Sequence, residues 1–419
     1  MKAAFTIAAG IDVHRDTVVV SVRKKSTSIE DDVVETRTFE TFRDALVQMT
    51  EWFESEGVEV VGLESTGVYW MPVVRVLQER VAKLTVWLVN PLDVKRRAGR
   101  KTDRKDSRWL SELVLYGLVA PSYIPSREQS ELRKLTRHRT KLVADQTRYQ
   151  NRILKELESS GVKLASVVTD CMGMTGRAII DALLVGDPNV DIANLAKGHL
   201  RKKIPLIRRA IDGSFTPSTK LVLRQLLDLL DRAAEQMRAT DVEIRSLMRS
   251  WESDQSLVMT IPALKETSSA AVLAESGTDM SLFPSSKHLA AWAGLAPGSE
   301  ESAGKAKPAP ARKGNKYLRT ALVQCAWAAV RMKQGFWPVV FRRLRARLGP
   351  KKAIVAIARK MLVALYHILR ERTPYRDPET PPTNPKTRER LARRFRDKLQ
   401  ALGFLVQLTP TQSGGETVS

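Results

Sequence analysis

The order of apolar segments in the first ninety residues constrains the fold of this chain more than any other feature. Two β-branched runs lie within residues 4–22, separated by the polar turn His14-Arg15-Asp16, and a third short run follows at Thr36–Phe39. The predicted elements that follow are a helix over Phe42–Glu56, a strand over Val58–Leu63, a helix over Pro72–Arg80, a strand over Leu84–Val89 and a further helix. Alternating helices and strands after a run of strands indicate an α/β domain with a mixed sheet.

This order is the one expected of an α/β domain that is ribonuclease-H-like or RuvC-like, and we predict such a domain over residues 1–125. Any other α/β domain with a mixed sheet remains the alternative. The chain has 419 residues, so at roughly 150 residues per domain it has room for one or two more domains.

The rest of the chain is predicted to be mainly helical. Residues 126–158 form a long basic helix, and residues 218–252 carry apolar side chains alternately three and four positions apart, as in a coiled coil. We therefore expect a helical coiled-coil or linker region over 126–254 and a mainly α-helical domain over 255–372, with amphipathic helices at 316–333 and 353–370. Residues 373–419 are expected to form a Pro/Thr-rich linker, a basic helix over 388–402 and a flexible tail.

The net charge of the chain is +23, and it is unevenly distributed. Residues 91–160 contain 17 basic and 9 acidic side chains, and residues 305–419 contain 26 and 6. Such an excess favours a polyanionic partner, nucleic acid first and an anionic membrane surface second. Two cysteines cannot build a zinc site of four thiolates, and no apolar run is long enough to span a bilayer, so we expect a cytoplasmic protein.

Four carboxylates in the first domain are candidate metal ligands. Asp12 lies in the first strand, Glu64 ends the strand VEVVGLE, and Asp103 and Asp106 are three residues apart, on one side of a helix if that stretch is helical. Converging carboxylates need a cation, and oxygen ligands suit Mg²⁺ or Mn²⁺, which can clamp the reacting oxygens of a phosphodiester. The alternative is that Asp12 caps a turn and the other two pair with neighbouring basic residues.

Two basic stretches are candidate nucleic-acid contacts. One surrounds the acids and the other surrounds Ser302, a serine within the predicted loop Gly298–Ala311. The residues concerned are Lys95, Arg96, Arg97, Arg100, Lys101, Arg104 and Lys105 in the first stretch, and Lys305, Lys307, Arg312, Lys313, Asn315, Lys316 and Arg319 in the second. Upstream, Ile261-Pro262-Ala263-Leu264 followed by Ser268–Gly277 resembles one arm of a helix-hairpin-helix.

These segments occur together in an informative order. They are GIDVHRD, GLESTGVYW, NPLDVKRRAGRKTDRKDSRWLSEL, IPALKETSSAAVLAESG, LAAWAGLAPGSEESAGK and RKGNKYLRTALVQCAWAAVR. The set resembles the DEDD-type insertion-sequence transposases, which have a RuvC-like N-terminal domain and a serine-bearing C-terminal transposase domain. The resemblance covers about residues 5–120 and 257–333.

The resemblance implies a site-specific DNA recombinase guided by a structured noncoding RNA of its own element, often called a bridge RNA. It implies that Asp12, Glu64, Asp103 and Asp106 hold Mg²⁺, and that Ser302 forms a covalent phosphoserine with DNA. It further implies a homo-oligomer, dimers assembling to a tetramer, whose helical segments link the subunits. One departure is the hairpin at Ala263–Thr267, where family members usually have glycines.

Two other interpretations of the residues remain open. A RuvC-like endonuclease that cuts DNA junctions with water as the nucleophile would need the four acids and Mg²⁺, but not Ser302. A non-catalytic nucleic-acid-binding protein would need only the basic stretches.

Overall fold

The computed structural model describes residues 3–26, 32–65, 67–81, 83–91, 94, 106–186, 191–296, 298–302, 305–309, 314–378, 392–393, 395–397 and 399–407, with the backbone alone at 298–302 and 305–309. The contacts divide the chain into two compact units, Met1–Ser126 and Arg127–Ser419. The finer predicted boundaries, at 254 and 372, remain predictions.

Unit 1 is built on a six-stranded mixed sheet. The strands are β1 (Ile7–Val13), β2 (Thr17–Lys24), β3 (Val33–Glu40), β4 (Val60–Glu64), β5 (Thr85–Val89) and β6 (Pro121–Ser122), in the order β3-β2-β1-β4-β5-β6. β1, β2 and β3 form an antiparallel meander, whereas β4 and β5 run parallel to β1. The short β6 was not predicted because two residues carry no recognisable pattern.

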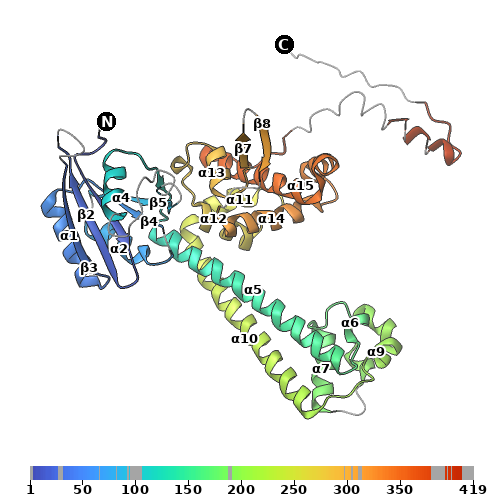
Figure 1. Ribbon diagram of the computed structural model, residues 1–419. Coiled ribbons are helices and arrows are strands. Elements are labelled where there is room, and N and C mark those ends of the chain that lie inside the picture. Colours follow the sequence, from blue (N-terminus) through green and yellow to red (C-terminus); the bar gives the residue numbers. More distant parts are fainter. Residues whose placement is uncertain are drawn as a thin grey trace. The chain divides into compact units, whose positions relative to one another are not determined.

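Helices cover both faces of this sheet (Figure 1). They are α1 (Arg43–Glu56), α2 (Trp70–Arg80) and α4 (Asp106–Leu115). α1 and α2 bury Phe53 and Leu77 against one face, and α4 buries Leu110 and Val114 against the other. Every element predicted in the first ninety residues is present, and the topology is compatible with a RuvC-like fold.

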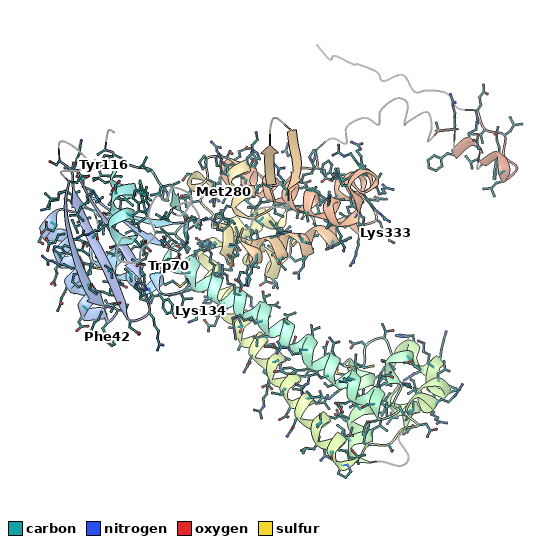
Figure 2. All side chains as sticks on the ribbon, viewed as in Figure 1. Phe42, Trp70, Tyr116, Lys134, Met280 and Lys333 are labelled. Carbon is teal, nitrogen blue, oxygen red and sulfur yellow. The ribbon has the colours of Figure 1, made fainter. Side chains whose placement is uncertain are left out.

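Unit 2 begins with a long antiparallel pair of helices, α5 (Arg127–Ser159) and α10 (Pro217–Met248). Arg139 of α5 donates to Asp241 late in α10, and Ile153 near the end of α5 shares a core with Leu223 early in α10. Side chains fill the space between the two helices along the pair (Figure 2). The predicted apolar seam of α10 therefore packs against α5 of the same chain, and pairing between subunits remains a prediction.

A small helical lobe closes the far end of this pair. It contains α6 (Leu164–Val167), α7 (Met174–Val185), α8 (Ile192–Leu195), the 3-10 helix η2 (Gly198–Lys203) and α9 (Ile204–Ala210), and these helices share one core with the ends of α5 and α10. The points at which the chain enters and leaves the lobe lie against each other. A Cβ on Gly213, at the exit, would lie 2.5 Å from the carbonyl oxygen of Ser160, at the entrance. The prediction of a helical coiled-coil or linker region over 126–254 did not include a separate lobe.

The last part of unit 2 is helical. Its elements are the 3-10 helices η3 (Arg249–Trp251) and η4 (Met280–Leu282) and the helices α11 (Glu252–Met259), α12 (Glu266–Ser276), α13 (Ser286–Trp292), α14 (Lys316–Val330) and α15 (Phe336–Glu371). α15 packs on α13 and α14, and it is kinked at Gly349, whose φ is 74°. The predicted helix over 353–370 is its second half.

The predicted loop over Gly298–Ala311 was wrong for most of its length. β7 (Gly298–Ser302) and β8 (Lys305–Ala309) form an antiparallel hairpin. The amino-acid composition of this stretch is typical of a loop, but it does not exclude a hairpin. Backbone hydrogen bonds between two edge strands do not require β-branched side chains, and an edge strand tolerates a proline such as Pro308.

The C-terminal predictions are only partly covered. The described residues between 392 and 401 are helical, in agreement with the predicted basic helix over 388–402. The predicted linker is outside the described residues from 379 onward, and so is the tail after 407.

Candidate active site

Asp12 and Glu64 lie at the ends of two neighbouring parallel strands, since Asp12 is the last residue but one of β1 and Glu64 is the last residue of β4. β1 and β4 are in register through Ile11 and Leu63, and each acid directly follows its member of that pair. Ile11 and Leu63 are buried against the α1–α2 side of the sheet. Because successive side chains on a strand alternate between faces, Asp12 and Glu64 both project toward the α4 side.

Two glycines bring α4 unusually close to that face. A Cβ on Gly10 would lie 2.2 Å from the carbonyl oxygen of Ser107, and a Cβ on Gly62 would lie 2.4 Å from the side chain of Val114. The two glycines are register partners on β1 and β4, two positions before the acids. The helix backbone therefore lies almost directly on the sheet.

The direction of α4 places its first residue near the acids. Leu115, at the end of the helix, accepts a hydrogen bond of 2.9 Å from the amide of Ala4, just before β1, whereas Ser107 lies against Gly10. α4 thus runs antiparallel to β1. Its N-terminal residue, Asp106, lies toward the strand ends that carry Asp12 and Glu64.

Polar contacts hold α4 in this register. The hydroxyls of Ser21 and Ser107 are 2.8 Å apart, and the buried guanidinium of Arg23 donates to the hydroxyl of Ser111 and pairs with Glu112 at 3.2 Å. A buried ion pair needs good geometry to offset its desolvation, so these bonds fix the helix against sliding along the sheet.

The chemistry of this edge fits a hard divalent cation, because Asp12, Glu64 and Asp106 offer only oxygen ligands. Asp12 is about four-fifths shielded from solvent, and its carboxylate is 3.1 Å from Nε2 of the exposed His14. Within the described part of the chain, no three His, Cys, Asp or Glu side chains are close enough together to hold an ion. Asp103 lies outside the described residues. The predicted basic run also lies outside them, namely Lys95, Arg96, Arg97, Arg100, Lys101, Arg104 and Lys105.

Ser302 lies at the tip of the β7–β8 hairpin in unit 2. It is the register partner of Lys305, the last pair before the turn, and Lys307 pairs with Glu300 further down. Arg312 and Lys313 lie outside the described residues. The tip of a hairpin is a position from which a serine can contact a partner molecule. Lysines such as the two on the opposite strand are residues that attract phosphates.

The base of this hairpin is closed by a tight contact. The backbone N–H of Asn315 donates a hydrogen bond of 3.0 Å to the carbonyl oxygen of Trp292. Beside it, a Cβ on Gly314 would lie 2.3 Å from the backbone nitrogen of Gly294. The side-chain oxygen of Asn315 caps α14 by accepting from the amides of its first turn. Asn315 thus holds the segment that precedes the hairpin in the chain against the start of the helix that follows it.

A buried carboxylate lies beneath this base. Glu275 is 1% exposed, and its two oxygens accept bonds of 2.7 and 2.8 Å from the guanidinium of Arg137 on α5. Arg133 adds a third contact, and the side-chain amide of Asn315 donates to Glu275 at 2.6 Å. The hydrogen bonds that Arg137 donates to the carboxylate of Glu275 raise the pKa of Arg137. Sequence reasoning missed this cluster; the one signal was a glutamate within the apolar stretch AAVLAES.

These contacts bear on the predicted nucleic-acid residues. Both side-chain polar atoms of Asn315 are engaged within the protein, so we assign Asn315 to the fold. Lys316 is exposed, with its Nζ 5.2 Å from the ring centre of Tyr317, and Arg319 is half-buried one turn further along α14.

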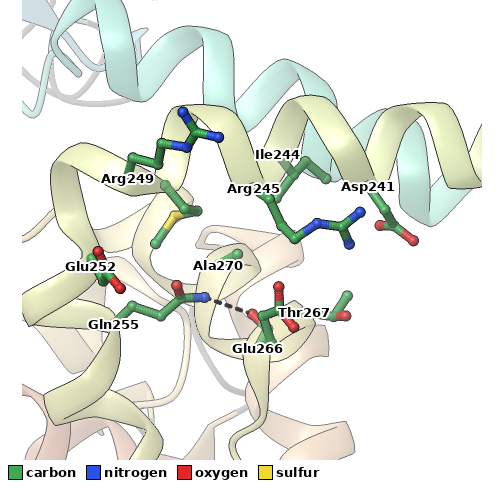
Figure 3. A pocket seen from close by; sticks show the side chains of 10 residues that line it. Asp241, Ile244, Arg245, Arg249, Glu252, Gln255, Glu266, Thr267 and Ala270 are labelled. Carbon is green, nitrogen blue, oxygen red and sulfur yellow. Dashed lines mark hydrogen bonds between the residues drawn. The ribbon is translucent and has the colours of Figure 1, made fainter.

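The segment that resembles one arm of a helix-hairpin-helix folds as the turn 260–265 and α12, and α11 precedes it. Ala263 in this turn has a φ of 72°, in the left-handed region that favours glycine. Beside it, α10, α11 and the start of α12 line an open pocket of about 390 Å³, with Arg245 and Arg249 on one wall and Glu266 on the other (Figure 3). Its mixed charge indicates no particular ligand.

Two transposase families match this chain, one over the segment with the acids and one over the segment with the serine. The DEDD transposase family of the IS110 type matches residues 9–161, which include all four predicted acids. The IS116/IS110/IS902 transposase family matches residues 255–337, which include Ser302 and Glu275. None of the described helices has the length and apolar character to cross a bilayer.

Individual relatives agree with these matches. A protein of Sinorhizobium fredii named as the transposase y4rJ is 27% identical over 79% of this chain and 81% of its own length. The transposase for insertion sequence element IS1111A of Coxiella burnetii is 25% identical over 69% of this chain and 72% of its own length. The IS110 insertion-element protein of 43.6 kDa from Streptomyces coelicolor is 26% identical over 66% and 72%.

The fold, the strand-end acids and these matches define a DNA transposase. The chain belongs to the IS110 family of insertion-sequence transposases, whose DEDD domain implies use of a divalent metal ion.

Proposed function

We propose that this transposase cuts and rejoins DNA through a serine nucleophile, Ser302, assisted by a divalent metal site of Asp12, Glu64, Asp103 and Asp106. The observation that carries the proposal is the position of three of these acids toward one edge of the sheet: Asp12 and Glu64 lie at the ends of neighbouring strands on one face, and Asp106 begins the helix docked on that face. Their side chains are not close enough together to hold an ion in this arrangement, so a bound ion would have to draw them together. Mg²⁺ suits such a ligand set best, and Mn²⁺ is the alternative.

The proposed chemistry runs in two balanced halves. In the first, Oγ of Ser302 bonds to phosphorus, one deoxyribose oxygen leaves and takes up a proton, and the serine proton passes to a nearby base. In the second, a deoxyribose hydroxyl displaces the serine, restoring a phosphodiester and a free hydroxyl. Because the covalent intermediate keeps the phosphoester bond energy, strands are exchanged without ATP. A bound metal ion would lower the pKa of the attacking hydroxyl and neutralise charge on the phosphoryl group.

The basic side chains have a proposed role in holding the substrate. Two groups flank the acids and the serine respectively: Lys95, Arg96, Arg97, Arg100, Lys101, Arg104 and Lys105 in the first, and Lys305, Lys307, Arg312, Lys313, Lys316 and Arg319 in the second. Contacts to phosphates fix position without reading sequence, so we propose that a noncoding guide RNA of the element supplies the sequence choice. We further propose a dimer that assembles to a tetramer.

The test is substitution of Ser302 by Ala, with Ser299→Ala on the same strand as the matched control. The full chain is incubated with Mg²⁺, DNA carrying the ends of its own element and RNA transcribed from that element, and protein–DNA adducts are resolved on a denaturing gel. We expect S299A to form the adduct and S302A to form none. If S302A still cuts the DNA without any adduct, water is the nucleophile, as in a RuvC-like junction endonuclease. An adduct in S302A would move the nucleophile to another residue.

A further inference from the structure

We infer that Glu275 is a positioning residue that fixes the base of the serine hairpin. This inference rests on the proposed role of Ser302. Glu275 lies on α12, 27 positions before the serine in the chain, yet it is joined through Asn315 to the end of the hairpin that leads into α14. The other end of the hairpin is held by the bond from Asn315 to Trp292.

The cluster joins three elements at one carboxylate. Arg137 binds both oxygens of Glu275 in the bidentate geometry that guanidinium favours, and Arg133 donates to the backbone carbonyl oxygen of Ala274 at 2.8 Å. Arg137 also lies over the ring of Tyr317, 4.3 Å from its centre. α5, α12 and the start of α14 are therefore locked together where the hairpin begins.

A buried charge is a poor way to stabilise a helix junction, since an apolar cluster of the same volume often does so better. What the charged cluster adds is a unique geometry, because bidentate and capping bonds are satisfied in one arrangement only. We therefore assign to Glu275 the orientation of the hairpin that the cluster supports.

Small errors at the base grow toward the tip. Each strand of the hairpin has five residues, so the tip is about 15 Å from the base, while the strands are about 4.8 Å apart. A shift of about 0.3 Å between the two strands at their first pair, Gly298 and Ala309, would therefore move Ser302 by about 1 Å. Misplacement on this scale is enough to slow a phosphoryl transfer about a hundredfold.

The first test compares Glu275→Gln with Glu266→Gln, the same substitution at an exposed position of the same helix. Single-turnover formation of the adduct is measured with saturating DNA of the element's ends, and the DNA affinity is measured separately. We expect E275Q to bind DNA within twofold of the native chain but to form the adduct at least about thirtyfold more slowly, and E266Q to match the native chain in both. An unchanged rate in E275Q would overturn the inference.

A second variant keeps the inference testable if E275Q does not fold. Asp is as good a helix cap as Asn, so Asn315→Asp preserves the start of α14 but sets a carboxylate against Glu275. We expect N315D to retain its helical circular dichroism and to lose adduct rate to a similar extent. A native rate in N315D would show that the link to Glu275 is not needed.

A distance measurement separates positioning from mere stability. Nitroxide labels on Ser299→Cys and Glu131→Cys report the hairpin relative to α5. We expect one narrow distance distribution in the native chain and a distribution at least twofold broader in E275Q or N315D, measured below the unfolding temperature. A narrow distribution in both variants would contradict the inference. Because this readout needs no reaction, it stands even if the S302A test removes the serine from the chemistry.

Discussion

The carboxylates discussed above have two different roles, and their degree of burial distinguishes one role from the other. Asp12 and Glu64 lie at the strand ends with part of their surface open to solvent, whereas Glu275 is enclosed and fully paired. A carboxylate that is to bind a metal ion must keep an oxygen accessible, while one that organises helices must not.

Substitution of Asp12 by Asn tests the metal site at this scale. Losing even an outer partner of a metal ligand costs 10–100-fold, so losing a direct ligand should lower metal-dependent cleavage by at least about a hundredfold. Asp16→Asn, in the exposed turn after the same strand, should cleave normally. Cleavage is measured against Mg²⁺ concentration with chelator as the blank. Equal activity in the two variants would reject Asp12 as a ligand.

Single residues were predictable from the sequence where their position follows from local structure. Asp12 and Glu64 could be placed because a strand end is readable from a few neighbouring residues. Glu275 could not, because its burial depends on Arg137 and Asn315, which are 138 and 40 positions away in the chain. Nothing near Glu275 in the sequence shows that these partners exist.

At the scale of elements, three glycines decide how closely neighbouring segments approach each other. Gly10 and Gly62 let α4 rest on the sheet, and Gly314 lets the hairpin base close on Gly294. Strand and helix patterns predicted the elements themselves, but close approach between elements has no periodic signal. The β7–β8 hairpin was missed for a related reason, since its residues resemble a loop in composition.

Gly10→Ala measures the importance of the sheet–helix approach. Its new methyl group would meet backbone atoms of α4 at 2.2 Å, so the helix must move. Overpacking of this kind costs about 1–3 kcal/mol, and the shift would carry Asp106 away from the strand ends. We expect a lower denaturant midpoint by tryptophan fluorescence and slower metal-dependent cleavage. An unchanged midpoint would mean that α4 relaxes without strain.

The turn between α11 and α12 offers the opposite experiment. Ala263 has a left-handed φ of 72°, which costs a residue with a Cβ roughly 1–2 kcal/mol. Ala263→Gly should therefore raise the free energy of unfolding by about 0.5–1 kcal/mol after the added flexibility of the unfolded chain is counted. Ala270→Gly, within α12, should lower it. Thermal unfolding of the two variants checks the sign, and destabilisation by A263G would contradict the strain.

At the scale of the whole molecule, the charge is concentrated on folded structure as well as on the end of the chain. Residues 305–419 carry 26 basic side chains, and 19 of them precede residue 379. Several of these residues belong to α14 and α15, whose apolar faces are buried in unit 2. The counts of basic and acidic side chains along the sequence predicted the excess of positive charge in residues 305–419. The helices of the structure show which of these basic side chains lie on folded elements.

Truncation after Pro378 distinguishes a folded binding surface from a charged tail. Each released phosphate counterion contributes about 0.9 to the slope of log affinity against log salt. A chain that keeps 19 of the 26 basic side chains of residues 305–419 should therefore keep most of that slope. The measurement is a DNA-binding titration at several salt concentrations. Loss of nearly the entire slope would place the DNA contacts in residues 379–419.

The meeting of Ser160 and Gly213 has an engineering consequence. The chain leaves the long helix pair and returns to it at adjacent points, so residues 162–212 are attached at one place, although they share a hydrophobic core with the ends of α5 and α10. A short glycine linker could bridge the gap they leave. Grafting a foreign module at this junction, about 50 Å along α5 from its first residue, would then attach new cargo while leaving the catalytic residues untouched.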